Sequence, residues 1–205
     1  MVEGGKTELI EKTLIALNGF YLIRGLYHEG TAVFGKAAAH LREQDNLAFA
    51  LVVSHQALCF QFLGDHGQAV ELYQQGLAVF RRLGIATQTA FCLERLSEIS
   101  RATKDYGAAR HCAEEARRVI DETDESERWR QAFILPLFGH IAFVTGDLFQ
   151  AKQWYEQTFA VSQTYGVQIG VVNALYFLGN VELALGEYSK AEHAYQACLK
   201  VCWRN

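Results

Sequence analysis

The sequence predicts an all-α fold, a right-handed superhelical solenoid of about five antiparallel helix pairs, and three observations lead to this prediction. A short turn motif recurs along the chain at intervals of 39, 40, 42 and 40 residues, which is typical of a solenoid of supersecondary units. The turn residues of its copies are Gly25, Gly64, Lys104, Gly146 and Gly186. Apolar residues between the turns recur at three- and four-residue steps, the period of one helix face. The 205 residues include a single Pro, so long helices are possible.

The composition excludes several classes of function. The formal net charge of −4 provides no basic surface for phosphates, so we expect no direct binding of nucleic acid. No apolar run is long enough to span a bilayer, and the N-terminus does not resemble a signal peptide. Five Cys without a Cys-x-x-Cys pair are typical of a reduced protein. The sequence therefore predicts a cytoplasmic protein with no membrane partner.

We expect residues 1–7 to be a leader or linker and residues 8–205 to form one domain. Its repeats are predicted at about 8–44, 45–84, 85–125, 126–166 and 167–205. Gly5-Lys6-Thr7 resembles the end of a phosphate-binding loop, but no buried strand precedes it and the chain begins too late to supply the first Gly of that motif. A linker is therefore the favoured interpretation of this segment.

Each repeat is predicted to contain two helices joined by the turn motif. Gly at the turn suits the left-handed residue that ends the first helix, and Asp65, Asp105 and Asp147 can cap the second helix. After the first pair, the helices are expected at about 46–63 and 68–83, 86–103 and 106–120, 127–145 and 148–165, and 167–185 and 188–203. Ser126 is a candidate cap for the helix that begins near Glu127, and Pro136 is expected to kink that helix.

The repeats share a pattern of small and aromatic residues around the turn. A small residue precedes the turn residue by seven positions: Asn18, Ala57, Ser97, Gly139 and Gly179. A second small residue follows it by five: Gly30, Ala69, Ala109, Ala151 and Ala191. An aromatic residue follows it by nine in four copies, as Phe34, Tyr73, Tyr155 and Tyr195, and Ala113 departs from the pattern. Small residues let two helices cross closely, and the aromatic ring fills the space beside them.

This pattern resembles the tetratricopeptide (TPR) repeat. The period near 40 exceeds the usual length of about 34 residues, and the usual Pro after the second helix is missing. Such longer repeats are similar to those of kinesin light chain and of bacterial signal-transduction ATPases and LuxR-type regulators. The stretch from Ala184 to Tyr188, with Ala191 and Glu192, resembles the bacterial group in particular.

The resemblance implies that the first helix of each pair lines a concave groove that binds a partner. The candidate partner-binding residues on these helices are Ser54, Gln61, Glu94, Glu98, Arg101, Phe133, His140, Phe143, Asn173, Tyr176 and Asn180. Asn173 and Asn180 are seven residues apart and share a helix face. A side-chain amide can donate to and accept from the backbone of an extended peptide, so this pair is the most suggestive.

We therefore expect a scaffold that binds a protein or peptide, as the sensor or scaffold segment of a bacterial signalling or transcription-regulatory protein. The alternative is a receptor for a small effector or signal peptide, for which Phe91, Phe133, Phe143 and Tyr176 would supply an apolar floor. The Lys/Asn/Arg clamp with which some TPR proteins hold acidic chaperone tails is absent. Glu98 would also repel a carboxylate, so we expect no binding of such a tail.

The sequence predicts neither an enzyme nor a metal or cofactor site. Glu94, Glu98 and Arg101 could perform acid–base chemistry, but an ion pair within the helix is favoured because no nucleophile accompanies them. Cys198 and Cys202 supply only two of the four ligands that zinc requires.

The last predicted helix carries apolar residues that would normally meet another helix. These are Tyr195, Cys198, Leu199, Val201 and Cys202. We expect this uncapped face to form a homodimer or to contact further domains of a longer parent chain.

Overall fold

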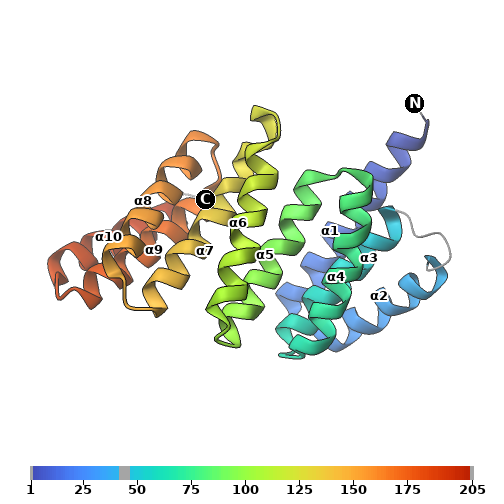
Figure 1. Cartoon of the computed structure of the whole chain (residues 1–205), viewed down its shortest axis with the longest axis horizontal. Coiled ribbons are helices and arrows are strands. Elements are labelled where there is room, and N and C mark those ends of the chain that lie inside the picture. Colours follow the sequence, from blue (N-terminus) through green and yellow to red (C-terminus); the bar gives the residue numbers. More distant parts are fainter. Residues whose placement is uncertain (1, 42–46, 204–205) are drawn as a thin grey trace. The chain divides into compact units, whose positions relative to one another are not determined.

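The structure, a computed structural model, describes the backbone of residues 2–41 and 47–203 and the side chains of residues 12–14, 16–41 and 47–203. All the regular elements of this part of the chain are helices, as Figure 1 shows. They are α1 (Val2–Arg24), α2 (Tyr27–Leu41), α3 (Leu47–Phe62), α4 (His66–Leu83), α5 (Ala86–Ala102), α6 (Tyr106–Asp121), the short 3-10 helix η1 (Glu125–Arg130), α7 (Gln131–Val144), α8 (Leu148–Thr164), α9 (Gln168–Ala184) and α10 (Tyr188–Cys202). The all-α prediction is confirmed.

The chain divides into two compact units, Met1–Ile99 and Ser100–Asn205, and the division falls within α5. In the first unit α2 packs against α3 and α3 against α4, while α1 contacts both α2 and α3. In the second unit α6 packs against α7, α7 against α8, α8 against α9 and α9 against α10. Each unit is thus a stack of helix pairs, and the expectation of a single domain stays a prediction.

Two local expectations differ from the structure. Helix α1 begins at Val2, so residues 2–7 are its first turns and Gly5-Lys6-Thr7 is helical, while Met1 lies outside the described residues. Ser126 does not cap the helix after the acidic connector. Instead it lies inside η1, and α7 begins only at Gln131 with no side-chain cap. Residues Glu125–Arg130 form this 3-10 helix in place of the first turns of the predicted α-helix.

The turns between paired helices have the predicted chemistry. Gly64, Gly146 and Gly186 have φ angles of +79°, +89° and +79°, the left-handed conformation that costs Gly little. The following Asp accepts a hydrogen bond from the backbone N–H three residues later in each of three helices. Asp65 Oδ1 accepts from Gln68 at 3.1 Å, Asp105 Oδ1 from Ala108 at 2.9 Å and Asp147 Oδ1 from Gln150 at 2.9 Å. The left-handed turn and the N-cap are both confirmed.

The contact between a small residue and an aromatic ring is also present, and in the second unit the small residue is Gly139 or Gly179. A Cβ added at Gly139 would lie 2.6 Å from Cε1 of Tyr155, and one added at Gly179 would lie 2.5 Å from Cε1 of Tyr195. Real Cβ atoms essentially never approach so closely. The rings of Tyr155 in α8 and Tyr195 in α10 therefore pack directly on the backbone of the preceding helix.

Lys104 occupies the one turn position that departs from Gly, and it adopts a φ of +66°. A side chain in this conformation costs roughly 1–2 kcal/mol, part of which is offset by the greater entropy of an unfolded Gly. We expect Lys104→Gly to stabilise the protein by about 0.5–1 kcal/mol in urea unfolding. Lys104→Ala is the control, since it keeps the unfavourable φ and should give no such gain.

Gly139→Ala tests the contact with Tyr155. Ala is the better helix former by about 0.5–1 kcal/mol, but overpacking typically costs roughly 1–3 kcal/mol. We therefore expect a net destabilisation of about 1 kcal/mol in urea unfolding, because the buried ring has no room to move. The matched control is Gly19→Ala in α1, where an added Cβ meets nothing within 4 Å, and that variant should be more stable than the parent. Equal stabilisation by the two changes would contradict the packing described here.

Candidate functional site

Three buried or half-buried tyrosines on second helices hydrogen-bond to polar side chains on first helices. Tyr73 donates to Gln61 Oε1 at 3.0 Å in the first unit. In the second unit Tyr195 donates to Asn180 Oδ1 at 2.7 Å, and the Tyr155 hydroxyl lies 2.8 Å from His140 Nδ1. The tyrosine that packs the two helices together therefore also holds a polar side chain of the first helix in one orientation.

The second unit contains a pocket of about 250 Å³ that is lined in part by His140, Tyr155 and Asn180. Its lining residues are Arg101, His140, Phe143, Val144, Tyr155, Phe177 and Asn180. They come from the end of α5, from α7 and α9, and, through Tyr155, from α8. Four of the predicted partner-binding residues, Arg101, His140, Phe143 and Asn180, thus line one pocket.

Phe177 is the centre of the aromatic cluster beside this pocket. Its ring lies edge-on to His140 with centroids 4.3 Å apart and stacks on Tyr155 at 5.2 Å. Tyr176 meets it edge-on at 5.1 Å. Rings packed at these distances and angles fix one another's positions, so the pocket has a rigid apolar wall.

The imidazole of His140 is neutral at pH 7. Burial lowers its pKa to about 4, and the positive charge of Arg101 acts in the same direction. Burial raises the pKa of Tyr155 well above its usual value, so its hydroxyl keeps its proton. The contact between His140 and Tyr155 is therefore a hydrogen bond between two neutral groups.

Arg101 brings a positive charge to the pocket. Its Nε is buried and has no hydrogen-bond partner among the described residues. A buried N–H of a guanidinium without an acceptor is costly, and a bound acceptor would relieve that cost.

In the first unit the predicted groove residues bond to one another instead. Gln61 Nε2 donates to Glu98 Oε2 at 3.3 Å, and Arg95 Nη1 lies 3.0 Å from the same oxygen. The Arg95 guanidinium also lies over the ring of Phe91, 5.7 Å from its centroid. The charge of Glu98 is therefore neutralised within the unit.

Ser54 and Glu94 are not exposed to a partner. Ser54 is 2% exposed and donates to the carbonyl of Ala50 at 2.8 Å, and Glu94 is 1% exposed with Arg95 at 4.0 Å. At these positions the side chains of α3 and α5 point toward the core and not toward the predicted groove. We therefore leave both residues out of the candidate site.

The other predicted residues of the second unit, Asn173, Tyr176 and Phe133, are not among the residues that line the pocket. Asn173 and Tyr176 are exposed on α9, and Tyr176 is also 6.2 Å from the ring of Tyr195. Phe133 lies edge-on to Trp129 at 5.9 Å, with Arg130 over its ring, near the start of α7. It does not line the pocket that contains His140.

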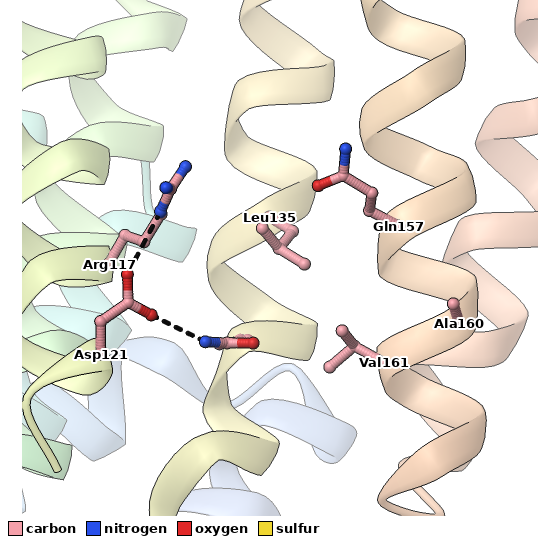
Figure 2. Close-up of a pocket in the computed structure, with 7 residues that line it drawn as sticks. Arg117, Asp121, Leu135, Gln157, Ala160 and Val161 are labelled. Carbon is pink, nitrogen blue, oxygen red and sulfur yellow. Dashed lines mark hydrogen bonds and ion pairs between the residues drawn. The ribbon is translucent and has the colours of Figure 1, made fainter.

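A second pocket, of about 330 Å³, lies between α6, α7 and α8 and is shown in Figure 2. Arg117 and Asp121 point toward each other across one side of it, with Nε and Oδ2 3.4 Å apart. Asp121 also accepts from Gln131 Nε2 at 2.8 Å. Because these polar groups satisfy one another, this pocket is less suited to a ligand than the pocket around His140.

Metal and membrane sites can be assessed for the part of the chain that the structure describes. No cluster of three or more His, Cys, Asp or Glu side chains there could hold a metal ion. Cys198 donates to the carbonyl of Val172 at 3.4 Å, and burial raises the pKa of its thiol. Within the described residues every helix is too short or too polar to serve as a membrane span.

The outer face of α10 carries exposed apolar side chains. Tyr188, Leu199 and Trp203 are the most exposed of these. Of the residues on the predicted uncapped face, Leu199 and Cys202 are exposed, whereas Tyr195 and Cys198 hydrogen-bond to α9. A homodimer and a contact with further domains both stay predictions.

Paired helices with a glycine turn, a packed tyrosine and a polar first-helix face define a helical-repeat scaffold for protein interactions. The chain belongs to the tetratricopeptide repeat family, whose model matches residues 46–122 and 131–202. Repeats of this family typically mediate protein or peptide binding, and its members are generally non-catalytic scaffolds. The family prediction is confirmed.

Several solved structures share the fold of this chain. BtubC (BKLC) from P. vanneervenii is 19% identical with a TM-score of 0.74, over 94% of this chain and 80% of that one. PilF of Pseudomonas aeruginosa is 18% identical with a TM-score of 0.67, over 96% and 78%. A putative kinesin light chain with TPR-like repeats from Podosopora anserina is 14% identical with a TM-score of 0.64, over 94% of both chains. Comparison with curated protein sequences gives no significant match.

Acid should destabilise the protein through His140 and through His55, which burial also gives a pKa of about 4. The unfolded side chain has a pKa of about 6.5 and so binds more protons than the folded one between pH 6.5 and 4. The stability that each neutral, buried histidine contributes is therefore fully present above pH 6.5. It is lost as the pH drops through this window. Between pH 7 and pH 5 each histidine should cost on the order of 1 kcal/mol in urea unfolding.

His140→Gln should reduce this loss of stability, and the exposed His111 provides the control. His111→Gln should leave the difference between pH 7 and pH 5 unchanged. A loss of the same size in the parent and in His140→Gln would show that His140 does not contribute to the acid sensitivity.

Proposed function

We propose that this protein binds an extended peptide segment of a partner protein along the first helices of its second unit. We further propose that it does so as the sensor or scaffold segment of a bacterial signalling or transcription-regulatory protein. The observation that carries the proposal is the pocket between α7 and α9. Exposed Tyr176 contacts Phe177 of its wall, and exposed Asn173 lies seven residues before Asn180 on α9. Its polar groups His140 and Asn180 are held by buried hydrogen bonds.

Held side chains favour binding because they lose little freedom when a ligand arrives. Asn180 is tied to Tyr195 and His140 to Tyr155, so neither must be ordered by the peptide. Asn173 and Asn180 are about 10.5 Å apart along α9 at 1.5 Å per residue. An extended peptide advances about 3.3 Å per residue, so the two amides match backbone groups three residues apart. The pocket beside Asn180 would take one side chain of that peptide.

The alternative, a receptor for a small effector, is less well supported by the size of the pocket. Sites for small molecules usually enclose roughly 300–1,000 Å³. The pocket of about 250 Å³ fits an amino-acid side chain better than a complete effector.

The regulatory context rests on the resemblance of the last repeat to those of bacterial signal-transduction ATPases and LuxR-type regulators. The stretch that carries it runs from Ala184 to Tyr188. Ala184 ends α9 and Tyr188 begins α10, so the stretch is the turn between these two helices.

Selection from a displayed library of random 12-residue peptides tests the proposed function. Selected peptides should bind with micromolar affinity in calorimetry, and Asn173→Ala and Tyr176→Ala should each weaken binding by about 5- to 10-fold, or 1–1.4 kcal/mol. Gln157→Ala, on the exposed face of α8 at the second pocket, should have no effect.

Two outcomes would contradict the proposal. One is a set of peptides whose affinity depends on Gln157 and not on Asn173 or Tyr176. The other is a thermal-shift screen in which small metabolites raise the melting temperature and no peptide does, which would support the effector receptor. A photo-crosslinking residue at position 176 should also capture a regulatory protein in the source cells when one at position 157 does not.

A further inference from the structure

The polar groups that line the pocket around His140 can be assigned as donors or acceptors from their hydrogen bonds. Asn180 Oδ1 accepts from Tyr195, which uses one of the two lone pairs of this oxygen. Its two N–H groups remain as the groups that it can offer to a ligand.

The tautomer of His140 follows from the same accounting. Tyr155 is 1% exposed, and among the described residues its hydroxyl has no acceptor other than His140 Nδ1. The hydroxyl proton therefore goes to Nδ1, since otherwise it would be buried without an acceptor. A neutral imidazole that accepts at Nδ1 carries its own proton at Nε2, so His140 also offers a donor.

Arg101 supplies the third donor and the only formal charge among the residues that line the pocket. Its side chain lines the pocket, and its buried Nε has no partner in the described part of the chain. The lining residues include no carboxylate, and Glu98, three residues before Arg101 in α5, is paired with Arg95 at 3.0 Å. The repulsion of a carboxylate that the sequence suggests for Glu98 is thus largely cancelled.

The geometry points to a carboxylate as the group that this pocket takes, bound by Arg101, His140 Nε2–H and the Asn180 amide. A carboxylate accepts hydrogen bonds and donates none, so it satisfies all three donors. A neutral amide would bring two N–H donors to a pocket with few acceptors, and it could not pair with the charge of Arg101. The methylene groups next to the carboxylate would pack on Phe143 and Phe177. This inference rests on the proposed function only in that the carboxylate would belong to the partner peptide.

Paired fragments test the pocket without a peptide. 3-Phenylpropionate and its neutral isostere 3-phenylpropionamide can be titrated into the labelled protein while NMR follows the side-chain N–H₂ resonances of Asn180. We expect the carboxylate to bind at least about tenfold more tightly than the amide, consistent with a charge-assisted pair. In Arg101→Gln that preference should disappear, and in Arg101→Lys part of it should return.

The control is Arg117→Gln, which removes an arginine that is already paired with Asp121 in the second pocket. It should keep the full preference for the carboxylate. Equal binding of the two fragments, or a preference that survives in Arg101→Gln, would overturn the inference. Unfolding curves of the variants separate a lost site from a lost fold.

The peptides selected above then distinguish the source of the carboxylate. A loss of affinity on Asp→Asn or Glu→Gln within the peptide indicates a side chain, and a loss on amidation of the peptide indicates its C-terminus. If peptide affinity depends on Asn173 and Tyr176 but the fragments show no preference, the proposed function is supported and the carboxylate site is contradicted. If the fragments show the preference but no peptide binds, the carboxylate site is supported and the proposed function is contradicted.

Discussion

The contact between a second-helix tyrosine and the first helix of its pair is the interaction on which both the fold and the site depend. Its ring requires a small residue opposite it, and in the second unit that residue is Gly139 or Gly179. Its hydroxyl reaches beyond the ring to a polar side chain of the first helix, His140 or Asn180. One side chain therefore packs the pair together and orients a group that faces the pocket.

The two units use this contact differently. In the first unit Tyr73 holds Gln61, which then bonds to Glu98, and Glu98 is paired with Arg95. The polar groups there satisfy one another. In the second unit the described hydrogen bonds end at His140 and Asn180, and both residues line the pocket that Arg101 also lines. This difference is why we place the binding site in the second unit.

The sequence predicted the architecture well because the repeat has strong local causes. Gly64 and Gly146 end helices in the left-handed conformation, and Asp65 and Asp147 cap the next ones, so helix bounds follow from short motifs. The late start of α7 was missed because Ser126 has the identity of a cap without the geometry of one, which depends on the chain folding into η1.

The residues that line the pocket were predicted only in part. Arg101, His140, Phe143 and Asn180 were among the predicted partner-binding residues, but Phe177 was not. Phe177 follows Asn173 by four residues, so the helix period places it on the same face. Tyr155 and Tyr195 were read as packing residues, since a sequence shows where an aromatic ring falls but not where its hydroxyl ends. The burial of Ser54 and Glu94 depends on the rotation of α3 and α5, which tertiary packing decides.

The protonation state of the His140 ring tests the central claim most directly, because the tyrosine contact fixes it. Nitrogen-15 NMR at neutral pH distinguishes a proton on Nε2 from one on Nδ1. We expect a neutral ring with the proton on Nε2, and a change in the Nδ1 signal when Tyr155→Phe removes the donor. A proton on Nδ1, or a ring whose signals do not respond to Tyr155→Phe, would show that the tyrosine does not orient the site.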